Sequence, residues 1–250
     1  MSGHSKWHNI RLRKGAQDAK RGSLFTKLAK EILMAAKAGG GSPDTNLRLR
    51  LAIQKAREAS MPNDNIQRSI QRGTGELAGA SYEEVIYEGY GPGGVALLVE
   101  VATDNKNRTV SNIRSILTKH GGRMVESGSV SYRFRAIGRV TINKSDVDED
   151  TLFGIAIEAG AEDVRTEDPE AYEIITLPED FHNVRQAIEA TKIPIANAEY
   201  TMEPADTVQL DEKDASLLMR LMDRLEDDED VQKIHGNFDI ADEILEAIGG

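Results

Sequence analysis

The side chains of this chain that could do chemistry are mostly cationic, and they are concentrated at its beginning. Residues 1–73 carry fifteen Lys or Arg and five Asp or Glu, a balance of +10, whereas the whole chain has a net charge of −11. Residues 74–250 therefore sum to −21. A cationic segment followed by an acidic remainder favours contact between the front of the chain and a polyanion.

The sequence shows no recognisable arrangement of nucleophiles or metal ligands. The chain has no cysteine, which excludes disulfides, thiolate catalysis and cysteine-based zinc sites. Its five histidines show no metal-binding spacing on an ordered element, and no GxSxG nucleophile turn occurs. We therefore expect no catalytic residue, no metal and no cofactor, and a protein that is not an enzyme. An enzyme acting on a small molecule stays open as a weaker hypothesis, which would require a pocket of converging polar groups.

Two further motifs could bind ions, but both have simpler interpretations. The glycine-rich segment 89–94 lacks the Gly-Lys-Ser/Thr and the following helix of a phosphate-binding loop, so we interpret it as a hairpin turn. The acidic run 226–230 has five consecutive carboxylates without the spacing of a calcium loop. We expect it to be a solvated loop between a helix and a strand.

The remaining signal is nucleic-acid binding. Lys and Arg spread over several helices would contact the phosphate backbone, and we recognise no recognition helix, RNP motif or KH loop. Residues 2–21 could be an arm that orders on its partner or a simple flexible terminus, and Trp7 could stack on a base or pack against the first domain. The candidate contact residues are Lys6, Trp7, Arg11, Arg13, Lys14, Lys20, Arg21, Lys27, Lys30, Arg48, Arg50, Arg68, Arg72, Lys106 and Arg108.

Most of these cations lie on a predicted three-helix domain. Apolar residues at helical spacing predict a helix over 23–37, with Ser23 as its N-cap, and a second helix over 46–59. A third, short helix is expected to start at Asn63 as its cap. Together with the basic arm, these helices form a predicted domain over residues 1–80.

Beyond residue 80 the spacing at which apolar residues recur changes from about 3.6 residues toward 2 residues, which indicates strands. The chain is predicted to form an α+β multidomain fold, with two ferredoxin-like α+β domains, one inserted in the other, after the helical domain. The discontinuous domain comprises 81–135 and 206–250, with strands at 82–88, 95–101, 130–134, 207–210 and 231–235, and a helix capped by Asp211. The inserted domain, 136–205, shows the order βαββαβ.

Several properties favour the cytoplasm as the location. No apolar run approaches the roughly 18 residues of a membrane span, and residues 1–20 lack the apolar region of a signal peptide. Charged residues at 29% and hydrophobic residues at 39% fit a globular protein.

A set of longer motifs resembles one known family. The segments are GHSKW (3–7), AQDAKRG (16–22), FTKL (25–28), RLR (48–50), SMPNDNI (60–66), YEGYGPGGV (87–95), TDNKNRT (103–109), GSV (128–130) and LEDDEDVQ (225–232). In order and spacing they are similar to those of the YebC family, and the resemblance covers essentially the whole chain.

The resemblance implies a cytoplasmic protein with a helical N-terminal domain and two α+β domains, the third inserted into the second, and no catalytic residues. Bacterial members are usually described as probable transcriptional regulators that bind DNA. Mitochondrial relatives act as translational activators, and some bacterial members are linked to stalled ribosomes. We therefore expect a DNA-binding regulator, with a ribosome-associated factor that binds rRNA or tRNA as the alternative. A protein partner for the acidic domains is possible under either hypothesis, and no membrane partner is expected.

Overall fold

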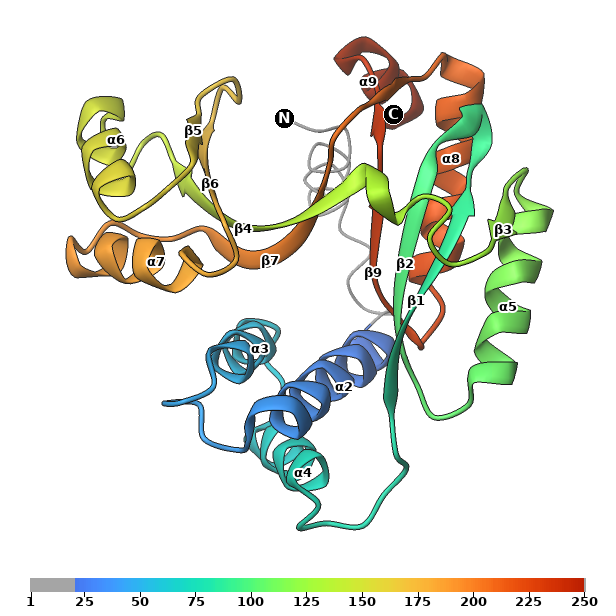
Figure 1. Cartoon of the computed structure of the whole chain (residues 1–250), viewed down its shortest axis with the longest axis horizontal. Helices are drawn as coiled ribbons and strands as arrows, with labels where there is room; N and C mark the ends of the chain where they lie inside the picture. Colours follow the sequence, from blue (N-terminus) through green and yellow to red (C-terminus); the bar gives the residue numbers. More distant parts are fainter. Residues whose placement is uncertain (1–20, 250) are drawn as a thin grey trace. The chain divides into compact units, whose positions relative to one another are not determined.

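The computed structural model describes residues 21–249, apart from the side chains of Arg21, Asp242 and Glu246 (Figure 1). The described chain divides into two compact units. One runs from Phe134 to Ala205, and the other contains the residues on both sides of it. Each unit is described by itself below.

The larger unit begins with the helices α2 (Arg21–Gly39), α3 (Leu47–Glu58) and α4 (Asn63–Thr74) (Figure 1). Their shared core contains Leu28, Ile32, Leu49, Ile53 and Ile66, among others. The predicted N-cap at Ser23 is wrong, because Ser23 lies inside α2, and Asn63 is likewise the first residue of α4 and not its cap.

Asn46 joins the first two of these helices. Its side-chain oxygen accepts a hydrogen bond from the Leu49 N–H at 3.0 Å, which caps α3. Its amide nitrogen donates to the carbonyl oxygens of Ala35 and Gly40, both at 2.8 Å, so it also binds the last turn of α2. A single buried amide thus fixes the turn between α2 and α3.

The rest of the larger unit is a four-stranded antiparallel sheet in the order β3-β1-β2-β9. The strands are β1 (Glu83–Tyr90), β2 (Ala96–Thr103), β3 (Arg123–Val125) and β9 (Val231–Gly236). Helices α5 (Lys106–Lys119) and α8 (Glu212–Glu226) pack against it in one core. The elements β8 (Val208–Gln209), β10 (Phe238–Asp239) and α9 (Asp242–Gly249) complete the unit, with β8 and β10 paired in parallel.

The hairpin between β1 and β2 turns through the short helix η1 (Pro92–Gly94). Gly93 has a φ of 68°, and a Cβ there would lie 2.3 Å from the Leu210 side chain. The glycine is thus required by packing, as expected for a turn and not for a phosphate-binding loop.

The strand predicted over 130–134 is wrong. The short helix η2 (Ser131–Arg133) occupies this place, and β4 begins only at Phe134. The cause is Glu88, which is buried and whose carboxylate accepts hydrogen bonds from the N–H groups of Gly128, Val130 and Ser131 at 2.7, 2.7 and 3.1 Å. These N–H groups already donate to a side chain, so the segment cannot use them to pair with a neighbouring strand.

The smaller unit contains β4 (Phe134–Asn143), α6 (Glu149–Glu158), β5 (Asp163–Arg165), β6 (Ala171–Thr176), α7 (Phe181–Ala190) and β7 (Asn197–Pro204). Its antiparallel strands take the order β5-β6-β4-β7. This combination of chain order and sheet order is the ferredoxin-like arrangement. At Gly138, Phe181 of α7 lies so close to β4 that an added Cβ would be 2.4 Å from its ring.

The predicted α+β architecture with a helical N-terminal region is therefore confirmed. In the part of the chain that the structure describes, no helix is long and apolar enough to cross a membrane. The same residues contain no group of His, Asp or Glu side chains arranged to hold a metal ion.

Candidate nucleic-acid interface

Six of the predicted contact residues, Lys6, Trp7, Arg11, Arg13, Lys14 and Lys20, lie outside the described residues. Arg21 is the first residue of α2, but its side chain is not among the parts that the structure describes. The remaining eight cations can be placed, and they divide into those that bind other parts of the protein and those that do not.

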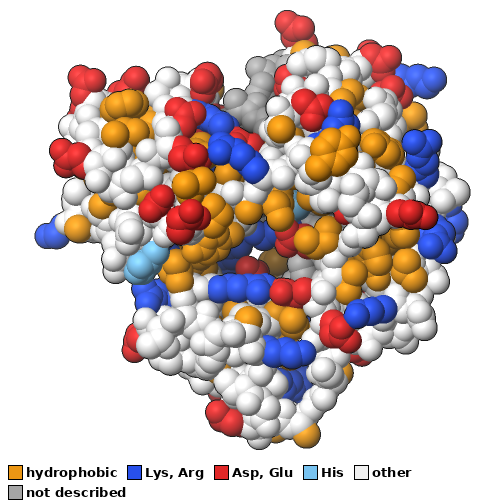
Figure 2. All heavy atoms as spheres, in the orientation of Figure 1, with side chains coloured by type: hydrophobic (Ala, Val, Ile, Leu, Met, Phe, Trp, Pro, Cys, Tyr) orange, Lys and Arg blue, Asp and Glu red, His pale blue; other side chains and the backbone are white. Residues whose placement is uncertain are grey.

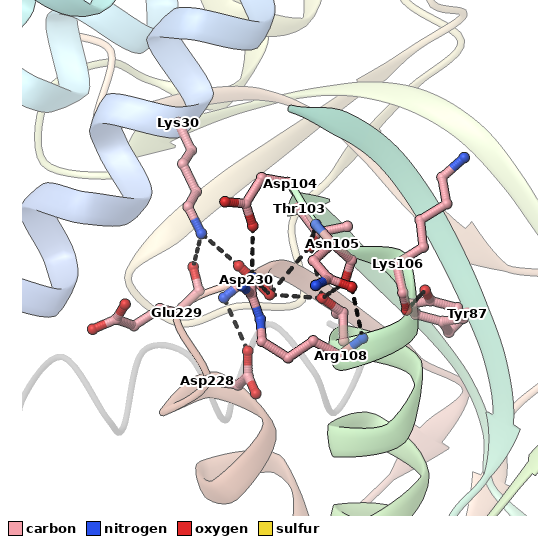
Figure 3. Close-up of polar contacts among 11 residues, drawn as sticks. Lys30, Tyr87, Thr103, Asp104, Asn105, Lys106, Arg108, Asp228, Glu229 and Asp230 are labelled. Atoms are coloured by element: carbon pink, nitrogen blue, oxygen red, sulfur yellow. Dashed lines mark hydrogen bonds and ion pairs between the residues drawn. The ribbon is translucent and has the colours of Figure 1, made fainter. Parts of the chain in front are cut away.

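Lys30 binds the protein itself, so its prediction as a phosphate contact is corrected. Its side chain is buried, and Nζ donates to Asp230 Oδ1 at 2.7 Å and to the Glu229 carbonyl oxygen at 2.9 Å (Figure 3). It also lies 5.3 Å from the centroid of the Tyr82 ring. Lys27, one turn earlier, donates to the carbonyl oxygen of Glu226 at 2.5 Å. Lys27 therefore attaches α2 to the end of α8, and Lys30 attaches it to the loop between α8 and β9.

Asp230 is the centre of this attachment. Besides Lys30, its carboxylate accepts hydrogen bonds from Thr109 Oγ1 at 2.7 Å, Arg108 at 2.9 Å and Thr103 Oγ1 at 3.3 Å (Figure 3). Burial raises the pKa of Asp230, but the hydrogen bonds from Lys30, Thr109 and Arg108 outweigh it and lower the pKa to about 2. The acidic run was expected to be a solvated loop, and for Asp230, which is 5% exposed, that expectation is wrong.

The cations at the start of α5 also have acidic partners. Lys106 pairs with Glu83 at 2.6 Å, and this hydrogen bond raises the pKa of Lys106. Arg108 pairs with Asp104 at 2.8 Å as well as with Asp230, and these partners raise its pKa. Both side chains remain about half exposed, so each would have to share its charge between a carboxylate and any phosphate.

The two arginines at the start of α3 bind neighbouring groups. Arg48 forms a two-nitrogen ion pair with Glu84, and this hydrogen bond raises the pKa of Arg48. Arg50 donates to the carbonyl oxygens of Pro43 and Asp44, both at 2.9 Å, and so holds the loop that precedes the helix.

Arg68 and Arg72 differ from all of these. Both are exposed on α4, and neither side chain has an ion pair or hydrogen bond within residues 21–249. Ile66, Ser69 and Ile70 form the buried side of the helix. The exposed side includes a surface that we name the α4 arginine face, which consists of Asn65, Gln67, Arg68, Gln71 and Arg72.

The α4 arginine face has the chemistry of a nucleic-acid contact. Arginine binds phosphate and the edge of guanine through two parallel hydrogen bonds, and Asn and Gln can bind adenine in the same way. In the sequence this face is indicated by two Gln-Arg pairs that are four residues apart, at 67–68 and 71–72. One acidic residue, Asp64, lies in the first turn of the same helix.

The predicted contact residues do not include Arg57, an exposed cation of the helical region. The side chain of Arg57 has no ion pair or hydrogen bond with any described residue. Its neighbour Lys55 pairs with Glu31 of α2 at 3.5 Å. Spacing on α3 separates the two sides of the helix, but it does not show which side has an acidic neighbour.

Comparison with known proteins agrees with this architecture over nearly the whole chain. Residues 5–76 match a family model described as the TACO1/YebC protein N-terminal domain. Residues 82–238 match the model of the TACO1/YebC second and third domain.

Individual relatives are similar over their full lengths. A probable transcriptional regulatory protein of Geobacter sulfurreducens is 56% identical, with 99% of this chain and 100% of the relative covered. One from Persephonella marina is 53% identical over the same shares of the two chains. The crystal structure of a conserved hypothetical protein from Aquifex aeolicus, 47% identical, matches with a TM-score of 0.82 over 91% of this chain and 94% of that one. These matches and the shared fold show that the chain belongs to the TACO1/YebC family.

Proposed function

We propose that this protein is a non-enzymatic regulator that binds duplex DNA through its helical N-terminal domain and acts in the cytoplasm. The observation that carries the proposal is the α4 arginine face, where Arg68 and Arg72 are exposed and lack acidic partners among the described residues. The names of the relatives, probable transcriptional regulatory proteins, support a regulatory role.

The contrast between α4 and α5 explains why we place the contact on α4. A cation that already pairs with a carboxylate must give up that partner, or share it, to bind a phosphate. Lys106 and Arg108 have such partners, at 2.6 and 2.8 Å. Arg68 and Arg72 have no such partner among residues 21–249, and they are one helical turn apart, so both can contact a single strand of the duplex backbone.

Fluorescence anisotropy with a labelled 30-base-pair duplex tests the proposal on the full chain. Replacing both Arg68 and Arg72 by Gln is expected to weaken binding about tenfold at 0.1–0.15 M salt. It should also reduce the slope of log K against log salt by about 1.8, or 0.9 for each lost phosphate contact. The matched control is Arg114→Gln with Lys119→Gln on α5, which removes the same charge from two exposed positions.

Unchanged DNA affinity in the α4 variant, or an equal loss in the α5 control, would contradict the proposal. The alternative, a ribosome-associated translation factor, calls for the same cations but another ligand. Sedimentation with ribosomes and a genomic-DNA pull-down at physiological salt distinguish the two. Ribosome co-sedimentation that depends on Arg68 and Arg72, without enrichment of DNA, would favour the translation factor.

A further inference from the structure

Helix α6 of the smaller unit has apolar side chains on both of its sides. Leu152 and Ala156 point into the core of the unit and are fully buried. Phe153 and Ile157 lie on the outer side and remain 49% and 41% exposed. They are four residues apart, so they form one continuous apolar ridge along the helix. Single exposed apolar residues are common on protein surfaces, but a ridge of two large ones on one helix is an interaction signal.

Gly154 lies beside this ridge, in the middle of α6. A Cβ at this position would meet nothing within 4 Å, so the fold does not require a glycine here. Glycine in a helix interior costs about 1 kcal/mol relative to alanine. A small residue on an exposed helix face lets the backbone of another helix approach closely, which gives the glycine a role outside the chain itself.

The charges around the ridge have a single sign. Residues 145–164 contain seven Asp or Glu and no Lys, Arg or His. Of these acids, Glu162 and Asp163 pair with Arg135 and Arg165. Glu149, Asp150 and Glu158 are exposed and have no ion pair within the described chain. At 100° per residue, Glu149 lies on one flank of the ridge and Glu158 on the other.

Figure 2 shows this arrangement in the region that α6 occupies in Figure 1, at the upper left, where an apolar patch is bordered by acidic side chains. The sheet of the same unit is different, because its carboxylates have cationic partners. Glu203 pairs with Arg135 at 2.7 Å and with Arg165 at 2.6 Å, and Glu199 pairs with Arg139 at 3.4 Å. The carboxylates around α6 therefore differ from those of the sheet in having no cationic partner among the described residues.

We propose that the α6 docking face, which consists of Glu149, Asp150, Phe153, Gly154, Ile157 and Glu158, binds a basic amphipathic helix of a partner protein. The apolar ridge would pack against apolar residues of that helix, with Gly154 allowing close approach. The carboxylates on both flanks select Lys and Arg beside the apolar stripe, and they repel nucleic acid and acidic proteins. This surface lies in a different unit from the α4 arginine face, so the inference is independent of the proposed function.

The test uses the full-length protein and a labelled synthetic 18-residue peptide of Leu, Ala and Lys, with Leu on one side of the helix and Lys on the other. A peptide of the same composition, reordered to spread Leu around the helix, is the control. The reordered peptide is expected to bind at least tenfold more weakly. Phe153→Ser with Ile157→Ser should reduce affinity for the amphipathic peptide about tenfold. Glu149→Gln with Glu158→Gln should reduce it severalfold and weaken its salt dependence.

Ile86→Ser is the matched control, because Ile86 is 45% exposed on β1 of the other unit. It should leave peptide binding unchanged. Circular dichroism melting checks that each variant is folded. Hydrogen exchange should show that the peptide protects residues 149–158.

Three results would overturn the inference. One is unchanged binding by the Phe153→Ser, Ile157→Ser variant. Another is equal binding of the two peptides, which would reduce the interaction to charge alone. The third is a dimer in sedimentation velocity that the same variant dissociates, which would identify a second copy of the chain as the occupant. None of these measurements depends on DNA binding, so their failure is distinguishable from failure of the proposed function.

Discussion

Asp230 shows how a single residue can have a role opposite to the one that its neighbours suggest. It is the last of five consecutive acidic residues, yet it is buried and accepts hydrogen bonds from Lys30, Arg108 and Thr109. A buried carboxylate is stable only when charged or hydrogen-bonding partners compensate for the lost water. Its lysine lies 200 residues away in the sequence, so no local pattern could have identified the pair.

Lys30→Met is expected to destabilise the protein by about 2–4 kcal/mol, because it leaves a buried carboxylate without its closest cation. Urea unfolding followed by circular dichroism measures the loss. Lys37→Met on the same helix is the control, since Lys37 is exposed and donates one hydrogen bond to the carbonyl oxygen of Tyr82. It should cost less than about 1 kcal/mol. Similar losses in both variants would show that Lys30 contributes no more than a surface lysine.

The pH dependence of stability should report the same carboxylate. The pKa of Asp230 is about 2 in the folded protein and about 3.9 in an unfolded chain. Its contribution is therefore present above about pH 4 and is lost as the pH falls toward 2. Asp230→Asn removes this contribution, so the gap in unfolding free energy between the two proteins should narrow by about 2 kcal/mol across that range. A gap that stays constant between pH 4 and pH 2 would refute this assignment.

At the scale of the elements, α2 has two apolar stripes. The first, with Leu28 and Ile32, packs against α3 and α4, and the period of apolar residues predicted it. The second consists of Lys30, Leu33, Met34 and Lys37, again at helical spacing, and its two apolar members pack with Ala102 of β2. In the sequence, a stripe that begins and ends with lysine resembles a solvated helix face. Only its contact with the sheet shows that it is a packed face.

Most elements could be predicted from the sequence, because their periodicity and caps are local. Asn105 caps α5 and Asp211 caps α8 through the side-chain hydrogen bonds that such caps make. The strand β3 was missed, since its three residues are too short to show an alternating pattern. The candidate interface was predicted only in part. Arg68 and Arg72 fit the expectation of an exposed cation, but whether Arg48 or Lys30 has an acidic partner depends on contacts between distant segments.

The close approach of α2 and α4 gives a prediction for Gly73. A Cβ at Gly73 would lie 2.4 Å from the Leu33 carbonyl oxygen and 2.8 Å from the Ala36 Cβ. Gly73→Ala should therefore destabilise the protein by about 1–3 kcal/mol, measured by urea unfolding. Gly154→Ala, the same change in open space on α6, should stabilise it by about 0.5–1 kcal/mol. A stabilising Gly73→Ala would mean that the two helices can separate without cost.

At the scale of the whole molecule, the net charge of residues 1–73 suggests more unpaired cations than the structure describes there. Lys27, Lys30 and Arg48 bind groups beyond residue 80, so they hold the helices against the sheet. The exposed and unpaired arginines that the structure describes in this segment are Arg57, Arg68 and Arg72. A count of charges thus indicates that a polyanion is plausible, but only the pattern of pairing indicates where it would bind.

The smaller unit should be removable. The residues that flank it, Arg133 and Asp206, form an ion pair at 2.7 Å, so a short linker can join them. Replacing residues 134–205 by a four-residue Gly-Ser linker should leave a cooperatively unfolding protein that binds duplex DNA as the full chain does. Circular dichroism melting and anisotropy measure the two properties. Loss of cooperative unfolding would show that the larger unit depends on the insertion.

The contacts of Asp230 have a consequence for how the molecule opens. One carboxylate joins the middle of α2, the start of α5 and the segment that leads into β9. None of these three can separate from the others without exposing the same buried charge. Their amide protons should therefore share a common free energy of exchange, and the front helices would detach in one step and not by gradual fraying.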